Sequence, residues 1–403
     1  MRTRRASYPS VIEGMQPRLR KSTLKRINQN LKSTVAERPC VDASRSVTKK
    51  SSVCKIDALP DDLLVAIIVG VSSTASSPAD LINTMLTCRR FCAAARHPVV
   101  LANVVIPGLA VKADSWSDGA HRFLKQCAVA GNVEACYTLG MIQFFCLNNR
   151  VGGASLMARA AMASHASALH SLAVIQLNGS GGTRKDKDLK AAVALCARAA
   201  SLGHVDAIRE LGHCFLDGYG VTKNFLEGRR LLLEANAREV AAVLAVSPRS
   251  FIQAAMDMTV KCEAVRCPHQ DQGVFNKADS IETSSLTRAS FSVGGHVGRH
   301  PILCLLEGGG CSLLSDFGCN VPPSKIHVAN KFMVDWFSQH PPAPGLRLCS
   351  HANCGRCETR RHEFRRCSAC GSVNYCSRAC QALDWKFRHQ YDCIPAAIWD
   401  NRG

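Results

Sequence analysis

The chain has 403 residues, of which 47% are apolar, and its formal net charge is +19. This length allows two to four domains at roughly 100–200 residues each. We find neither an apolar run of the ~20 residues that a membrane span needs nor the apolar core of a secretory signal, so we expect neither a membrane protein nor a secreted one. Of the 22 cysteines, 14 lie outside Cys349–Cys393, and we interpret them as small buried side chains with reduced thiols.

Residues 1–55 carry more than half of the excess positive charge, with 14 Lys and Arg against three acidic residues, a balance of +11. We expect a basic disordered tail, because such a segment buries too little apolar surface to order itself. Its role stays open between a plain solvated arm, an organelle transit peptide and a nuclear localisation signal. The nuclear signal would use one basic patch: Arg18, Arg20, Lys21, Lys25 and Arg26. We expect a nuclear and/or cytoplasmic protein, and no nucleic-acid binding, because the middle of the chain shows no basic face.

Residues 56–106 have the pattern of a compact helical module. Pro60 suits the first helical position, and Asp61 and Asp62 complement the positive end of the helix. A second helix is predicted from Asp80 to Phe91, closed by His97-Pro98. Four apolar residues share one face of the first helix: Leu63, Leu64, Ile67 and Ile68.

This module resembles an F-box. The resemblance rests on Leu59-Pro60 at the start of the first helix, the acidic pair that follows it, and the later Cys88-Arg89-Arg90-Phe91 segment. It implies docking to a Skp-type adaptor of a cullin ubiquitin ligase. An ordinary helical hairpin is the alternative. The residues expected to contact the adaptor are Leu59, Pro60, Leu63, Leu64 and Ile67.

Residues 115–245 are rich in Ala and contain an internal repeat. Ala135, Ala168 and Ala207 occupy equivalent positions, 33 and 39 residues apart. A period in this range, with small residues where helices cross, is typical of a solenoid of helix pairs, which offers a binding surface and no chemistry of its own. The Ala200–Ala207 and Gly218–Val221 steps resemble the Sel-like branch of the tetratricopeptide-type repeats. A non-repeating helical domain is the alternative.

The predicted fold is therefore mainly α, with an F-box helical module, an α-solenoid of short helix pairs and a small C-terminal double-zinc finger. Between the last two, residues 246–345 are predicted as a linker and mixed segment. Within that segment we expect one helix, over His327–Phe337. The sequence does not reveal what the segment does.

Residues 346–396 gather eight metal-ligand side chains, as C-x2-C, C-x2-C, C-x3-C and H-x3-C. The eight are Cys354, Cys357, Cys367, Cys370, Cys376, Cys380, His389 and Cys393. They suffice for two tetrahedral Zn²⁺ sites without an open position for water, which favours structural ions over catalytic ones. Cys349 is an alternative to Cys357; we favour Cys357 because a C-x2-C knuckle makes the tighter turn. The spacing leaves sequential and interleaved pairing open.

This string resembles a MYND finger, through Tyr375-Cys376-Ser377, Cys380-Gln381 and Asp384-Trp385. The resemblance implies interleaved sites, one with Cys354, Cys357, Cys376 and Cys380, the other with Cys367, Cys370, His389 and Cys393. It also implies that Gln381 and Trp385 bind short proline-containing peptides, although packing around the metal is an alternative role for Trp385. Five arginines nearby would offset the thiolate charge: Arg356, Arg360, Arg361, Arg365 and Arg366.

The order of F-box, repeats and MYND finger resembles a plant F-box family of this layout. It implies a non-catalytic substrate-recognition subunit of a Skp–cullin–F-box ubiquitin ligase, with the substrate protein unknown. A transcriptional or chromatin adaptor is the alternative. A SET-type methyltransferase is disfavoured because the sequence lacks an N-H-x-C segment. Replacing Cys376 is expected to unfold the finger and leave the repeat helices intact, because solenoid units depend mainly on their neighbours.

Overall fold

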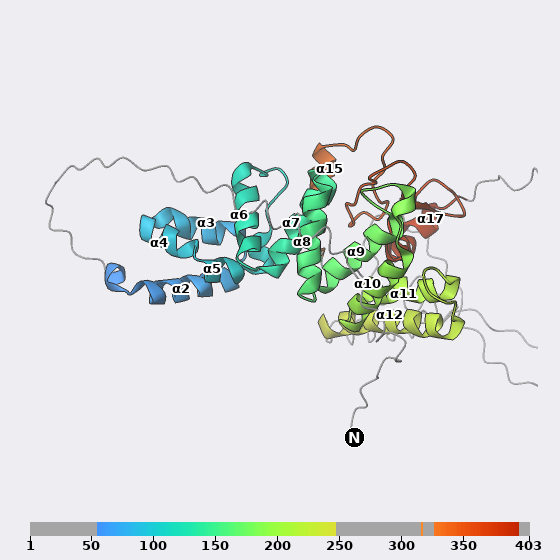
Figure 1. Cartoon of the computed structure of the whole chain (residues 1–403), viewed down its shortest axis with the longest axis horizontal. Coiled ribbons are helices and arrows are strands. Elements are labelled where there is room, and N and C mark those ends of the chain that lie inside the picture. Colours follow the sequence, from blue (N-terminus) through green and yellow to red (C-terminus); the bar gives the residue numbers. More distant parts are fainter. Residues whose placement is uncertain (1–54, 247–315, 317–325, 395–403) are drawn as a thin grey trace, which may run out of the picture. The chain divides into compact units, whose positions relative to one another are not determined.

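The computed structural model describes residues 55–246, 316 and 326–394 (Figure 1). They fall into two compact units, one with residues up to Leu109 and Gln126–Asn132, the other with Ala110–Lys125 and everything from Val133 onward. The basic tail, its nuclear patch and most of 246–345 lie outside the described residues. Among the described helices, none combines the length and the apolar character needed to cross a bilayer.

The first unit packs short helices around a small core, which includes Leu64, Ile68, Leu81 and Ala95. Its elements are η2 (Lys55–Ala58), α2 (Asp61–Thr74), α3 (Pro78–Thr87), α4 (Arg89–Ala95), α5 (Pro98–Ala102) and η3 (Ile106–Leu109).

The predicted second helix of this unit is wrong in its extent. It is two helices, α3 and α4, separated at Cys88, whose backbone is extended (φ −159°, ψ 168°). The Cys88 sulfur accepts a hydrogen bond from the Phe91 amide (3.4 Å) and so caps α4. Pro98 does not close a helix but opens α5, where the missing proline N–H costs nothing.

The second unit contains three helix pairs, here called the array, as the repeat pattern predicted. The pairs are α7 with α8, α9 with α10, and α11 with α12 (Figure 1). We call α7, α9 and α11 the first helices. Elements of this region are α6 (Asp118–Val129), α7 (Val133–Met141), η4 (Ile142–Cys146), α8 (Arg150–Met162), α9 (Ala166–Asn178), η5 (Arg184–Asp186), α10 (Leu189–Ser201), α11 (Val205–Asp217) and α12 (Phe225–Val246).

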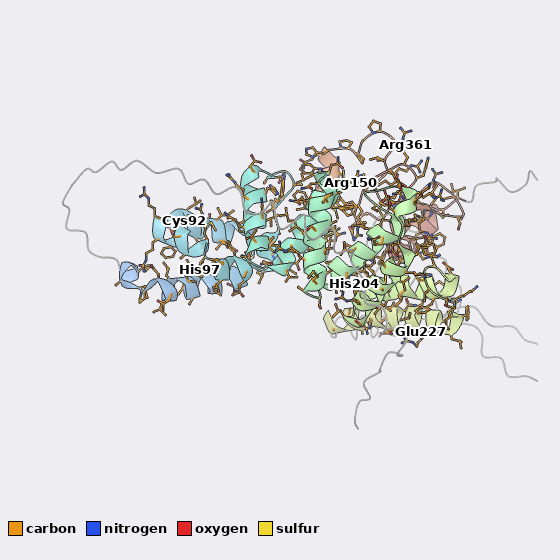
Figure 2. The ribbon with its side chains drawn as sticks, in the orientation of Figure 1. Cys92, His97, Arg150, His204, Glu227 and Arg361 are labelled. Carbon is orange, nitrogen blue, oxygen red and sulfur yellow. The ribbon has the colours of Figure 1, made fainter. Side chains whose placement is uncertain are left out.

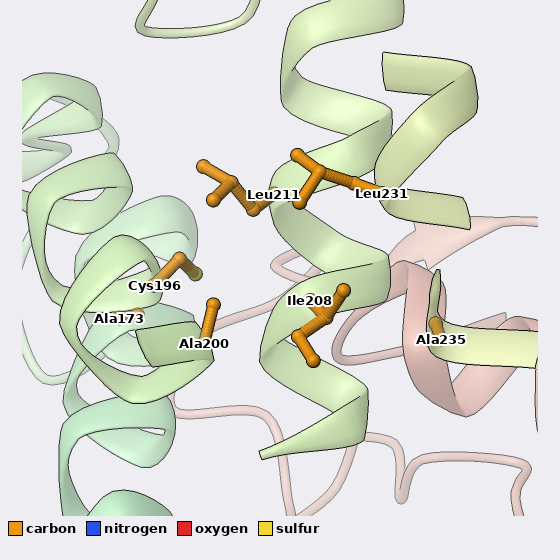
Figure 3. Packing of buried hydrophobic residues seen from close by; sticks show 7 residues of the cluster. All are labelled: Ala173, Cys196, Ala200, Ile208, Leu211, Leu231 and Ala235. Carbon is orange, nitrogen blue, oxygen red and sulfur yellow. The ribbon is translucent and has the colours of Figure 1, made fainter. Parts of the chain in front are cut away.

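Small side chains hold the array together. Figure 3 shows a buried cluster in which Ala173, Cys196, Ala200 and Ala235 meet larger residues such as Ile208. Glycines mark two of the helix crossings: a Cβ on Gly140 would lie 3.0 Å from the Gly153 carbonyl oxygen, and one on Gly212 3.1 Å from that of Gly228. The Leu-Gly signature of the repeat therefore marks backbones in close contact.

A histidine begins two of the first helices. His165 and His204 accept hydrogen bonds on Nδ1 from the amides of Ala168 (3.1 Å) and Ala207 (3.3 Å), and so cap α9 and α11. The residue before each histidine has a left-handed backbone, at Ser164 (φ 61°) and Gly203 (φ 87°). The middle repeat thus places a serine where the last repeat has a glycine.

The C-terminal part adds α15 and the finger to this unit. Its strands pair antiparallel, with Arg365 opposite Tyr375 and Arg366 opposite Asn374. Its elements are α15 (Val328–Gln339), β1 (Arg365–Arg366), β2 (Asn374–Tyr375), α16 (Arg378–Asp384), the π-helical turn η7 (Trp385–His389) and α17 (Gln390–Asp392).

Ser164→Gly should stabilise the array. A left-handed backbone costs an L-residue roughly 1–2 kcal/mol, whereas glycine adopts it freely at a smaller entropic cost. We expect the free energy of unfolding to rise by about 0.5–1 kcal/mol in urea denaturation. Ser155→Gly, inside α8, is the matched control and should lower it. An unchanged or lower value for Ser164→Gly would show that the left-handed backbone of this turn carries no strain.

Candidate functional site

Four cysteine sulfurs converge in a buried group, here called the first group: Cys349, Cys354, Cys376 and Cys380, with ligand atoms all within 4.8 Å of one another. The Cys376 sulfur lies 3.6 Å from that of Cys354 and 3.5 Å from that of Cys380. Hydrogen bonds from the neighbouring thiols, together with Arg356, hold the pKa of Cys354 well below its usual value. Four sulfurs at this spacing fit a tetrahedral metal site.

The choice of Cys357 as a ligand is corrected by this geometry, because Cys349 takes that place. Leu348 and Cys357 form an antiparallel bridge, and the Cys349 amide donates to the Arg356 carbonyl (2.9 Å). Side chains alternate along such a ladder, so Cys357 lies on the face opposite Cys349 and Arg356. Burial and the carboxylates of Glu358 and Glu363 raise the pKa of the Cys357 thiol to about 12.

The second group unites Cys367, Cys370, His389 and Cys393, the set that the MYND resemblance implied. Cys370 Sγ lies 3.4 Å from His389 Nε2, and Cys367 Sγ lies 4.0 Å from Cys393 Sγ. Burial works against the Cys370 thiolate, but hydrogen bonds from Ser372 and Val373 lower its pKa to about 6. Two members are only half-buried, whereas all four of the first group are buried.

A third convergence, of His170, His204 and Asp206, lies in the array. His204 Nδ1 accepts the Ala207 amide hydrogen bond, which leaves the ring proton on Nε2, the atom that a metal would need. Burial lowers the pKa of His170 to about 3, and the positive charge of Arg356 adds to this. The structure therefore favours a packed pair of neutral imidazoles, with ring centroids 4.7 Å apart, over a metal site.

The finger is bound to the array through α9. Asn178 Nδ2 donates to the Cys376 carbonyl (2.8 Å), and Val174 packs among the first-group cysteines. Arg360 donates to the Gly179 carbonyl (2.7 Å) and to that of Asn178, so it satisfies the free end of α9. Arg150, labelled in Figure 2, donates to the Thr359 carbonyl (3.3 Å).

A second junction joins α11 and α12 to the finger. The buried carboxylate of Glu210 accepts from the amides of Arg378 (2.8 Å) and Ala379 (3.3 Å), the first two of α16, and so caps that helix from a distant part of the chain. Lys386, which is 5% exposed, is paired with Glu239 (2.9 Å), which also pairs with the buried Arg209 (2.9 Å).

Helix α15 covers the first pair of the array. Glu134 on α7 accepts from His165 Nε2 (3.0 Å) and from His327 Nε2 (2.6 Å), the residue that caps α15. Burial alone would raise the pKa of Glu134, but these two histidines lower it to about 2. Trp116 meets Phe332 of α15 edge to face, with ring centroids 5.2 Å apart.

Each first helix is therefore in contact with α15 or the finger. The sequence interpretation assigned partner binding to the repeats. Within the described residues, the first helices instead contact α15 or the finger of the same chain. The expectation that loss of Cys376 would leave the repeat helices intact also changes, because the Cys376 carbonyl and sulfur adjoin residues of α9.

Gln381, in α16, and Trp385, at the start of η7, are four residues apart and both half-buried. The Trp385 ring packs edge to face against His389 of the second group, with centroids 5.7 Å apart. Trp385 therefore packs beside the second group and is still partly exposed to solvent. Tyr375 is fully buried, and its hydroxyl donates to Asp384 (2.7 Å). Tyr375 therefore supports the finger from within.

In the first unit, α2 has apolar residues on two faces. Leu64 (1% exposed) and Ile68 (0%) enter the core, whereas Leu63 (50%) and Ile67 (52%) face solvent one turn apart. An apolar outer face on a short helix is typical of a partner-binding site. Leu64 is thus corrected from a partner contact to a core residue. Leu59 is half-buried and Pro60 exposed.

The two pieces of the F-box pattern meet in space. Arg90, from the Cys88–Phe91 segment, is paired with Asp61 (2.8 Å) and donates to the Ile56 carbonyl (3.0 Å) and to that of Leu59. Exposed ion pairs add little stability. The contacts with the carbonyls fix the chain where it enters α2, so Arg90 positions the Leu59-Pro60 step.

Family models match three parts of the chain. The model of plant tetratrico peptide repeats matches residues 109–205, that of the Sel1 repeat residues 205–238, and that of the MYND finger residues 353–393. The MYND match begins after Cys349.

Two proteins of Arabidopsis thaliana are similar over most of the chain. F-box protein At1g67340 is 54% identical over 351 residues, 86% of this chain and 83% of its own. F-box protein At5g50450 is 47% identical over 343 residues, 85% of each. SET domain-containing protein 14 of Caenorhabditis elegans is 45% identical over 40 residues, 10% of this chain and 9% of its own. The chain belongs to the family of these plant F-box proteins and carries Sel1-type repeats and a MYND finger.

Proposed function

We propose that this protein is the substrate-recognition subunit of a Skp–cullin–F-box ubiquitin ligase. The first unit would bind a Skp-type adaptor, and the second would hold the substrate protein. The chain itself would form no covalent bond, and partner enzymes would transfer ubiquitin. A nuclear or cytoplasmic location is part of this proposal.

The observation that carries the proposal is the outer face of α2. Leu63 and Ile67 are half exposed although the helix already has a complete inner face. Arg90 fixes the chain that leads into this helix. Two exposed apolar side chains one turn apart on the same face of a helix support a partner-binding site there.

Replacing both outer residues, Leu63→Asp with Ile67→Asp, should weaken adaptor binding without unfolding the module. Two buried charges at an apolar contact should weaken binding roughly 30-fold, about 2 kcal/mol. The measurement is recovery of a purified Skp-type adaptor on immobilised full-length protein. Leu64→Asp is unsuitable, because that residue lies in the core.

The matched control is Val151→Asp with Leu226→Asp, two residues of the array that are each 81% exposed. It should bind the adaptor like the wild type. Equal recovery by the α2 variant and the wild type would contradict the ligase role and favour a transcriptional or chromatin adaptor.

We also propose that the two cysteine groups of the finger each hold one Zn²⁺. Four protein ligands saturate a tetrahedral ion, so both ions would be structural. Thiolate and imidazole ligands suit zinc, and the segment should fold only with its metal bound.

Cys349→Ala and Cys357→Ala separate the two candidates for the first group. The wild type should contain about two zinc ions per chain, Cys357→Ala about two, and Cys349→Ala about one. Elemental analysis of dialysed full-length protein gives the answer. If Cys357→Ala lost an ion and Cys349→Ala kept both, the geometric assignment would be wrong.

For the substrate side, we propose that Gln381 and Trp385 contact a proline-containing peptide segment. Both are half-buried on the finger, and a tryptophan ring offers a rigid apolar surface for an extended proline-rich chain. The array then acts chiefly as the support of this surface, since its first helices contact α15 and the finger.

A further inference from the structure

Arg356 lies where the first group of cysteines meets the array. It is 5% exposed, and its Nη1 lies 3.6 Å from Cys354 Sγ and 3.8 Å from Cys376 Sγ. Its Nη2 donates to Ser171 Oγ (2.9 Å), a buried residue of α9. One guanidinium thus contacts two metal-ligand sulfurs and the array together.

The charge of this buried guanidinium needs compensation. Removing one partner of a buried ion pair is strongly destabilising, because it leaves an uncompensated buried charge. Among the described residues, neither Glu358 nor Glu363 forms an ion pair with Arg356. Glu363 pairs with Arg360 (3.7 Å) and accepts from the Thr359 amide (2.6 Å), and Glu358 accepts from the Phe364 amide (3.0 Å). The sulfurs of Cys354 and Cys376, which face the guanidinium, can supply this negative charge as thiolates.

Four thiolates with one Zn²⁺ carry a net charge of about −2, and metal binding is what requires all four to be thiolates. A bound ion would also fix the positions of the Cys354 and Cys376 sulfurs, the two groups that Arg356 Nη1 contacts. Without the ion, these sulfurs lose the bond that joins them, and Arg356 loses the fixed contact that holds it beside Ser171.

We propose that the metal of the first group clamps the finger to α9 through Arg356, whereas the metal of the second group has no direct part in this contact with α9. This inference rests on the proposed zinc occupancy. Arg356 is a positioning residue: it transmits the presence of the ion to Ser171 and so to α9. The second group shows the contrast, because two of its ligands are half-buried and its sulfurs contact residues of the finger.

Arg356→Met tests the clamp in the full-length protein, because it keeps the length of the side chain and removes the charge. Hydrogen exchange of the α9 amides, measured by mass spectrometry, should become about tenfold faster or more, as the loss of a buried contact of about 1.4 kcal/mol or above requires. Zinc content should stay at the wild-type value. Arg366→Met, an exposed arginine of the same finger, should change neither quantity.

Two ligand variants test the asymmetry between the metals. Cys349→Ala should accelerate α9 exchange as Arg356→Met does, and Cys370→Ala should not. Ser171→Ala provides a milder probe if Arg356→Met does not fold: it should raise α9 exchange and keep both ions.

Two results would overturn the clamp: wild-type α9 exchange in Arg356→Met or Ser171→Ala with zinc retained, or equal acceleration by Cys349→Ala and Cys370→Ala. Measuring zinc in the same samples distinguishes failure of the proposed metal sites from failure of the proposed role of Arg356. A wild-type protein without zinc refutes the proposed metal sites themselves, whereas a zinc-loaded protein with unchanged α9 exchange refutes only the role of Arg356.

Discussion

The first helices of the array carry buried polar side chains that are hydrogen-bonded to the finger. Ser171 accepts from Arg356 and also lies 3.3 Å from the Tyr137 hydroxyl of α7, and Glu210 accepts from the first two amides of α16. A buried polar group without a partner costs about 1–3 kcal/mol, and a charged one more. The array therefore needs the finger as much as the finger needs the array, and a freely hinged finger is incompatible with these side chains.

This mutual dependence limits which surfaces of the array and the finger are left to bind a partner. A solenoid usually offers a face to a partner, but here α15 contacts α7, and the finger contacts α9 and α11. What the second unit can present is the half-buried Gln381 and Trp385 of the finger, and the second helix of each pair. The first unit presents Leu63 and Ile67 on α2. The adaptor role proposed above would need no catalytic centre, and it is in keeping with two groups that each offer four protein ligands to a metal.

Local patterns predicted the elements well. The helix pairs followed from the spacing of Ala135, Ala168 and Ala207, and the second cysteine group from the MYND resemblance. What failed depended on distant or alternating contacts. Cys349 replaces Cys357 because residues 347–349 pair with residues 356–358 and turn the two cysteines to opposite faces, which spacing does not reveal. Leu64 and Leu63 are neighbours with the same side chain, and only the packing of the other helices separates core from surface.

The contacts of Ser171 and Glu210 were missed for a related reason. Their partners lie 185 and 168 residues further along the chain. A signal was present: both residues stand just before the Leu-Ala or Leu-Gly pair of a repeat, a position on the buried side of the first helix. A polar residue at such a position indicates that something other than the array covers it.

The most direct test of the mutual dependence is the thermal unfolding of the full-length protein, followed by helical circular dichroism with and without a zinc chelator. We predict that the midpoint temperature of the unfolding transition of the array falls by at least about 6 °C on chelation. An unpaired buried charge costs about 3–5 kcal/mol, and 1 kcal/mol corresponds to a shift of roughly 2–4 °C for a unit of this size. An array transition that stays at the same temperature after both ions are removed would contradict the mutual dependence of finger and array.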